Sequence, residues 1–102
     1  MKKIEGLNKT YAYPNPFSPW LEASRIHYSV ENAQSKVTRE IFDFSMRKVR
    51  TLFSYASSSG KSEYDEIWDG KDDAGNVVPN GVYFYRIKID DKEMYGKILV
   101  VQ

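Results

Sequence analysis

Hydrophobic and polar residues alternate with a period of two along most of the chain, which is the pattern of half-buried β-strands. The clearest run is Gly81–Asp90, in which Tyr83, Tyr85, Ile87 and Ile89 share one face. The same alternation, with turn-forming residues between the runs, predicts strands at 10–13, 25–31, 37–44, 48–55, 63–68, 81–90 and 93–101. No stretch carries the period of an amphipathic helix. The pattern therefore predicts an all-β protein.

About seven short strands separated by frequent turns are typical of an antiparallel β-sandwich. The chain has 102 residues, of which 41% are hydrophobic and 15% aromatic, enough to bury one core. We expect one domain over residues 10–102, preceded by a poorly ordered lead-in at 1–9.

Charge and cysteine content remove several classes of function. The formal net charge is +1, so no overall field draws the chain to nucleic acid. The absence of cysteine excludes disulfides and zinc–thiolate sites. No apolar run is long enough to span a membrane, and Met1-Lys2-Lys3 leads into no signal-peptide core. We therefore expect no nucleic-acid partner and no membrane insertion.

No arrangement of residues predicts catalysis. The single histidine, His27, faces away from the core side of its strand and has no second histidine to work with. The serines Ser57–Ser59 form a loop without a G-x-S-x-G elbow, and the carboxylates are scattered along strands. We expect no catalytic residue, no cofactor and no enzymatic activity.

The loop D-G-K-D-D-A-G-N is the one candidate metal site. Asp69, Asp72, Asp73 and Asn76 offer the oxygen ligands that Ca²⁺ prefers. The spacing fails the usual D-x-[DN]-x-[DN]-G template, and no bidentate glutamate follows. Asp-Gly and Gly-Asn are also turn formers, so the loop is explained more simply by turns.

Two aromatic residues fall out of phase with the core. Phe42 and Phe84 alternate with buried neighbours and so face outward. Exposed, they would form a docking patch for a protein or a sugar ring. The alternative is that a neighbouring domain or the sheet itself covers them.

The proline-rich stretch Y-A-Y-P-N-P-F-S-P-W, residues 11–20, looks like a polyproline ligand in isolation. Since prolines lack a donor and fit only an edge or a break in pairing, we expect an edge strand ending at Tyr13 and a crossover from Pro14 to Pro19. Phe17 and Trp20 are expected to close one end of the core. Tyr13–Pro14 is a candidate cis bond.

Four blocks of the sequence resemble a known group of bacterial domains. Y-P-N-P-F (13–17) is similar to the start of C-terminal modules in large secreted bacterial proteins. The blocks V-T-R-E-I-F-D-F-S-M-R-K-V-R-T-L (37–52) and W-D-G-K-D-D-A-G-N-V-V-P-N-G-V-Y-F-Y-R-I (68–87) resemble the immunoglobulin-like domain of the flagellar hook-capping protein. G-K-I-L-V-V (96–101) resembles the closing strand of type IX secretion sorting domains.

The resemblance implies that the sandwich of about seven antiparallel strands is immunoglobulin-like, and it implies structural roles for particular residues. Trp68 would plug the core, and the Tyr83 ring would be buried with its hydroxyl bonded to nearby backbone. The residues that mark the fold are Tyr13, Pro14, Asn15, Pro16, Phe17, Trp68, Asp69, Gly70, Gly81 and Tyr83. Met46 departs from the pattern where the family has glycine. Arg39 departs from it where the family has an apolar residue, so we expect Arg39 to reach an edge or pair with an acid such as Asp43 or Glu66.

The resemblance also implies a function. It suggests a non-catalytic C-terminal accessory domain of a larger secreted or cell-surface bacterial protein, sorted or attached through the type IX secretion machinery. The partners would be that machinery and the preceding domains of the same polypeptide, with strand addition along an edge as one mode of contact. The residues expected to make the contact are Lys97, Ile98, Leu99, Val100, Val101 and Gln102.

Two alternatives stay open. One is a structural assembly module like the hook-cap domain, which would pack against copies of itself. The other is a carbohydrate-binding sandwich attached to a secreted hydrolase, using Phe84 or Trp20 as a platform.

Overall fold

A computed structural model describes residues 10–29, 36–52 and 63–102. Within them lie seven strands: β1 (Tyr11–Tyr13), β2 (Ser24–Ser29), β3 (Val37–Phe42), β4 (Lys48–Leu52), β5 (Glu63–Trp68), β6 (Gly81–Ile89) and β7 (Lys92–Val100). All seven predicted strands are confirmed, each within about two residues of its expected bounds in the described part. The expected lead-in at 1–9 and the expected strand ends at 30–31 and 53–55 lie outside the described residues, as do Ser57–Ser59.

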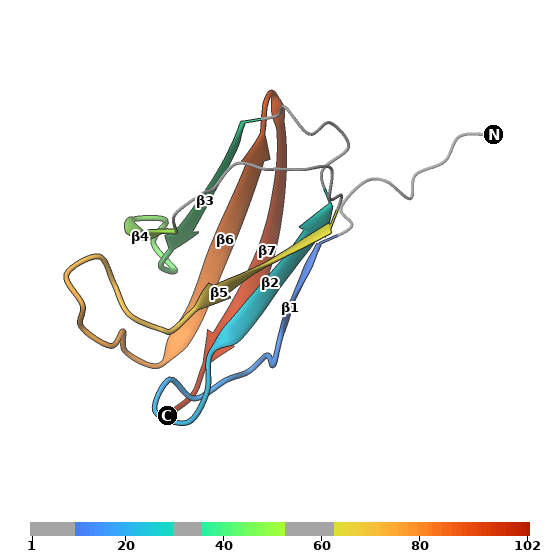
Figure 1. The fold of residues 1–102 in the computed structure, drawn as a ribbon. Coiled ribbons are helices and arrows are strands. Elements are labelled where there is room, and N and C mark those ends of the chain that lie inside the picture. The colour runs from blue at the N-terminus through green and yellow to red at the C-terminus, as the bar shows by residue number, and fades with distance from the viewer. Residues whose placement is uncertain (1–9, 30–35, 53–62) are drawn as a thin grey trace.

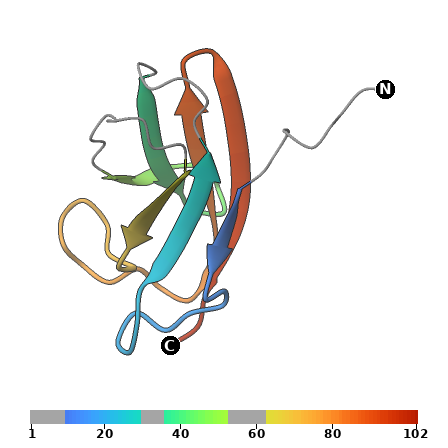
Figure 2. The ribbon, with the colours of Figure 1, turned by 45° about the vertical axis from the view of Figure 1, so that its right-hand side comes forward.

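The strands form two antiparallel layers. One sheet has the order β1-β2-β5 and the other the order β4-β3-β6-β7. Figure 1 shows the three-stranded sheet crossing in front of the four-stranded one, and both Figure 1 and Figure 2 show β1 beside β7, where the two sheets meet. This is the arrangement of an immunoglobulin-like β-sandwich. The alternation predicted the sandwich, and the sequence resemblance implied its immunoglobulin-like kind.

The core lies between the sheets and follows the predicted alternation. Along β6, Tyr83, Tyr85 and Ile87 are buried, while Phe84 and Arg86 between them are only half-buried. The buried side chains of the core are Phe17, Ile26, Tyr28, Val37, Ile41, Leu52, Trp68, Val78, Tyr83, Tyr85, Ile87, Ile98 and Val100. Period-two patterning therefore assigns the inward face of the central strands correctly.

The end of the core near the C-terminus is aromatic. Trp68 is fully buried and meets Phe17 and Tyr83 edge-on, with ring centroids 5.7 and 5.6 Å apart. The Tyr83 hydroxyl donates to the carbonyl of Pro79 at 2.7 Å, which is the expected tyrosine corner. Burial raises the pKa of Tyr83. The core roles predicted for Phe17, Trp68 and Tyr83 are confirmed.

Position 96 on β7 has room only for glycine, because the ring of Tyr85 on β6 fills the space that a side chain would need. Gly96 stands opposite Tyr85, and a Cβ at position 96 would fall 2.2 Å from that ring. The Tyr85 ring is itself fixed, because its hydroxyl lies 3.0 Å from the Thr10 hydroxyl, which donates to the carbonyl of His27. The glycine thus makes room for an aromatic side chain that links the two sheets.

Candidate functional site

The candidate contact region, Lys97–Gln102, is the end of the outermost strand of the larger sheet. Ile98 and Val100 are fully buried in the core. Lys97, Leu99 and Val101 alternate with them and are exposed, as is Gln102. Only these four side chains are therefore accessible to a partner, while Ile98 and Val100 hold the strand to the core.

The backbone edge of β7 is already occupied in this region. The Asn15 carboxamide donates to the carbonyl of Lys97 at 2.7 Å and accepts from the N–H of Leu99 at 2.8 Å. Next along, Phe17 donates to the carbonyl of Leu99 and accepts from the N–H of Val101, both at 3.0 Å. One asparagine side chain and one residue of backbone thus pair with β7 as a neighbouring strand would.

The segment that closes this edge is the predicted crossover. β1 ends at Tyr13, and the Tyr13–Pro14 and Asn15–Pro16 peptide bonds are both cis. Phe17 then enters the core and forms a parallel bridge with Val100. Tyr13–Pro14 is the candidate cis bond of the sequence, and Asn15–Pro16 is a second one that the sequence did not indicate. The strand end and the crossover are confirmed.

Gln102 is held by bonds to two other segments. Its carboxamide accepts from the Trp20 indole N–H at 2.6 Å and donates to the carbonyl of Val78 at 2.8 Å. Its backbone N–H donates to the Asn80 side chain at 2.9 Å. Trp20 itself is 68% exposed, so the expectation that it closes the core is wrong. Its indole N–H is directed to the chain end, and its ring lies on the surface.

The other edge of the same sheet, β4, is also closed by a side chain. Asp73 donates its backbone N–H to the carbonyl of Val49 at 2.9 Å, and its carboxylate accepts from the N–H of Thr51 at 3.0 Å. Exposed strand edges invite pairing with other chains, and a covering loop is one way in which proteins prevent this. On each edge of the four-stranded sheet, an Asx residue of the chain itself therefore covers part of the outer strand.

The remaining carboxylates of the 69–76 loop are similarly used. Asp69 accepts from the N–H of Lys71 and from Arg50, and Asp72 accepts from the N–H groups of Ala74 and Asn76, all at 2.9–3.0 Å. The predicted turns thus explain the loop. Within the described ranges no three histidine, cysteine or acidic side chains gather as a metal would need.

The outer face of the four-stranded sheet carries an aromatic row. Phe42 on β3, Phe84 on β6 and Lys97 on β7 lie side by side in register. Phe42 and Phe84 are half-buried, and Phe44, 74% exposed, stacks on Phe84 at 6.4 Å. The prediction that Phe42 and Phe84 point outward is confirmed.

The next row of this face is charged, and its one carboxylate is paired within the face. Glu40 forms a short ion pair with Arg86 and lies 3.8 Å from the Lys48 ammonium. The hydrogen bond to Glu40 raises the pKa of the Arg86 guanidinium. Arg86 also lies over the Phe42 ring at 5.2 Å. Glu40 is therefore fully engaged within the face.

Arg39 is buried rather than directed to an edge. It is 2% exposed and lies between the sheets, where it forms an ion pair with Glu66 at 2.9 Å and donates to the Tyr28 hydroxyl at 2.8 Å. Tyr28 in turn donates to Glu66 at 3.1 Å, and burial raises its pKa. Of the two acids predicted as partners, Glu66 is correct. Asp43 instead accepts from the N–H groups of Ser45 and Arg47 in the β3–β4 turn.

The single histidine is a surface residue of the smaller sheet. His27 stacks on Tyr11 at 4.8 Å and has Asp65 at 2.9 Å and Glu63 at 3.4 Å from its ring nitrogens.

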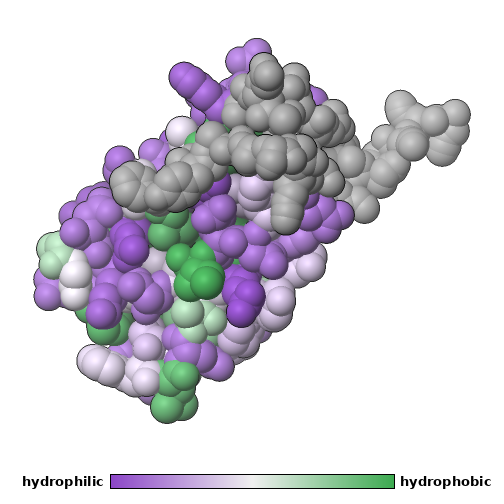
Figure 3. Space-filling model, viewed as in Figure 1, coloured by the Kyte–Doolittle hydropathy of each residue, from purple (hydrophilic) through white to green (hydrophobic). Residues whose placement is uncertain are grey.

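In Figure 3, which looks onto the smaller sheet, hydrophobic surface forms separate green areas among hydrophilic residues. The described part of the chain holds no helix capable of crossing a membrane.

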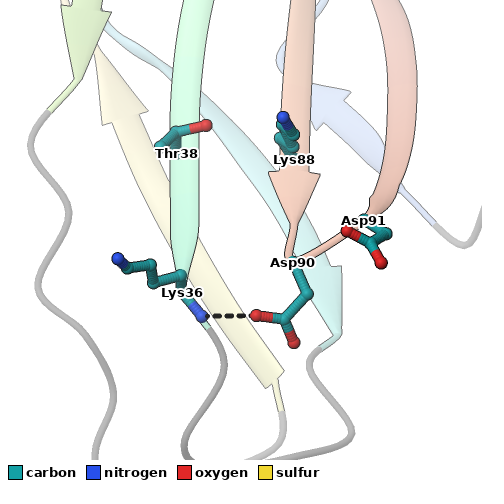
Figure 4. Close-up of a pocket in the computed structure, with 5 residues that line it drawn as sticks. All are labelled: Lys36, Thr38, Lys88, Asp90 and Asp91. Carbon is teal, nitrogen blue, oxygen red and sulfur yellow. Dashed lines mark hydrogen bonds between the residues drawn. The ribbon is translucent and has the colours of Figure 1, made fainter.

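One hollow of about 290 Å³ lies at the opposite end of the larger sheet, beside the β6–β7 turn. Figure 4 shows Thr38 and Lys88 on neighbouring strands above Asp90 and Asp91, with the Lys36 side chain turned away from the carboxylates. The backbone N–H of Lys36 donates to Asp90 at 3.0 Å. The residues that line the hollow carry charges of both signs and none of them is an apolar residue, so the hollow favours no particular class of ligand.

The structure defines an immunoglobulin-like β-sandwich domain. The sequence model of the FlgD Ig-like domain matches residues 21–93, well over half of the chain, and the chain belongs to this family. A search of curated protein sequences found no match.

Among solved structures, the chain is similar to PorZ, described as an essential bacterial surface component of the type IX secretion system of Porphyromonas gingivalis. The superposition covers 96% of this chain with a TM-score of 0.65 and 22% sequence identity. The chain spans 12% of the length of PorZ. At this identity the likeness establishes the fold.

Proposed function

We propose that this chain is a non-catalytic C-terminal accessory domain of a larger secreted or cell-surface bacterial protein, and that it acts in sorting or attachment through the type IX secretion system. The domain comprises residues 10–102, and its partners are the secretion or surface-assembly machinery and the preceding domains of the same polypeptide. The observation that carries the proposal is the near-complete superposition on a small part of PorZ. It is supported by the G-K-I-L-V-V strand at 96–101.

The proposal is tested by fusing the chain to the C-terminus of a secreted reporter enzyme in a host with type IX secretion. The reporter is expected at the cell surface or in the medium. A matched fusion carrying Trp68→Ala, which removes the largest core side chain, is expected to remain periplasmic because the domain cannot present a folded surface. A folded wild-type domain whose reporter stays in the periplasm would contradict the proposal.

A structural assembly module is the second candidate, favoured by membership of the FlgD Ig-like domain family. In this role the domain would pack against copies of itself or against a rod-like protein. Sedimentation of the chain over a wide concentration range separates the candidates. Ordered multimers favour assembly, whereas a monomer at all concentrations favours the sorting domain.

A further inference from the structure

The two closed edges restrict how a partner can bind the larger sheet. Strand addition needs free outward-pointing N–H and C=O groups. The carbonyl of Lys97, both backbone groups of Leu99 and the N–H of Val101 are already paired with Asn15 and Phe17. On β4, Asp73 pairs with the carbonyl of Val49 and the N–H of Thr51. A partner at the end of β7 therefore meets side chains rather than free backbone.

Those side chains continue the aromatic row of the outer face. Leu99, 37% exposed, stands opposite Val82 and next to the Phe42–Phe84–Lys97 row, with Phe44 stacked alongside. Phenylalanine and leucine side chains that share one exposed face form the apolar centre of a protein interface. These side chains come from three neighbouring strands of one sheet, β3, β6 and β7, and from the turn after β3.

Charge indicates the character of the partner. Glu40, which borders the row, is neutralised by Arg86 and Lys48. Lys97 stands in the row by its register opposite Phe84, and within the described ranges its side chain is in no ion pair. The local excess charge is thus positive, and it is complemented by a carboxylate.

We propose that the outer face formed by Phe42, Phe44, Phe84, Lys97 and Leu99 is the docking surface of the domain, and that its occupant is a folded protein surface with an apolar centre and an acidic rim. This inference rests on the proposed function. It replaces strand addition along β7 with recognition of side chains on the sheet face.

The test uses the reporter fusion with matched variants. Leu99→Asp and Lys97→Glu are expected to lower the surface-displayed fraction about ten-fold or more, as for central interface residues. Ile67→Asp and Arg25→Glu alter exposed residues on the outer face of the smaller sheet and are expected to leave display unchanged. Thermal melting of each purified variant confirms that it is folded.

Asn15→Ala separates face docking from strand addition. It frees the carbonyl of Lys97 and the N–H of Leu99. Strand addition therefore predicts an increase in the displayed fraction, whereas face docking predicts no increase. If folded Leu99→Asp and Lys97→Glu variants were displayed as well as the wild type, or if Asn15→Ala increased display, the inference would be overturned and the proposed function would still stand. A wild-type fusion retained in the periplasm would remove the proposed function as well.

Discussion

The two ends of the core are built from different chemistry. Near the C-terminus, Phe17, Trp68 and Tyr83 meet as an aromatic cluster with one hydroxyl bonded to backbone. At the other end, Arg39 and Tyr28 form a hydrogen-bonded group with Glu66 between the sheets. The aromatic end follows the family pattern, and the polar end departs from it.

The two ends differ in what their stability depends on. The aromatic end depends on the close packing of large apolar side chains, and the polar end depends on both partners of an ion pair being present. Aromatic side chains stabilise by burying area, and a smaller residue leaves a cavity. A buried ion pair contributes little net stability compared with apolar residues, yet breaking it leaves a buried charge unpaired. The aromatic end should therefore tolerate no truncation, while the polar end should tolerate joint replacement but not single replacement.

The largest effect is expected at Trp68. Trp68→Ala should lower the free energy of unfolding by about 3–5 kcal/mol, because the vacated volume lies against Phe17 and Tyr83. Urea unfolding followed by circular dichroism measures the loss. A loss below about 1 kcal/mol would contradict the role of Trp68 as the core plug.

The polar end is tested by a double-mutant cycle. Glu66→Met should cost about 3 kcal/mol, since it leaves the Arg39 charge buried with less compensation. Adding Arg39→Met should restore much of the stability, because the site then matches the apolar family pattern. If the double variant instead lost as much stability as the sum of the losses in Glu66→Met and Arg39→Met alone, the ion pair would not be the interaction that stabilises this end of the core.

A smaller gain in stability is expected at the turn after β3. Met46 adopts φ 66°, the conformation for which the family uses glycine. Met46→Gly should raise the free energy of unfolding by about 0.5–1 kcal/mol by relieving the clash of its Cβ. Met46→Ala keeps a Cβ and is the control, with no gain expected. Equal stability of the glycine and alanine variants would exclude backbone strain at this position.

The smallest effect concerns acid pH. Backbone N–H groups of Arg47 and Ser45 bond to the Asp43 carboxylate and lower its pKa below 3.8. The folded pKa lies below the unfolded value, so this stabilisation is present above about pH 3.8 and is lost as the pH falls through the folded pKa. Asp43→Asn should flatten that part of the stability–pH curve, measured by urea unfolding between pH 2 and 6. Superimposable slopes for the two proteins would contradict this assignment.

Most of the fold could be predicted because alternation and turn residues are local signals. Trp68, Tyr83 and Phe17 stand in recognisable motifs, so their burial followed from sequence. At Met46 the sequence showed only a departure from the family glycine; the structure shows that the backbone keeps a positive φ there with methionine in place.

The closing of the sheet edges could not be predicted in the same way. Asn15 and Asp73 bond to residues far along the chain or on another strand, and asparagine and aspartate are so common in turns that their presence indicates no such bond. Only the three-dimensional path shows that their side chains replace a strand. Likewise Glu66 was among the acids named for Arg39, but its bridge through Tyr28 depends on the packing of the two sheets.

The most direct test of the account is the dependence of reporter display on the secretion system itself. The reporter fused to the wild-type chain is expressed in a host with type IX secretion and in an otherwise identical strain that lacks the translocation machinery. We predict that the surface fraction falls in the deficient strain to the level of the reporter without the domain. An equal surface fraction in the two strains would contradict a role in type IX secretion.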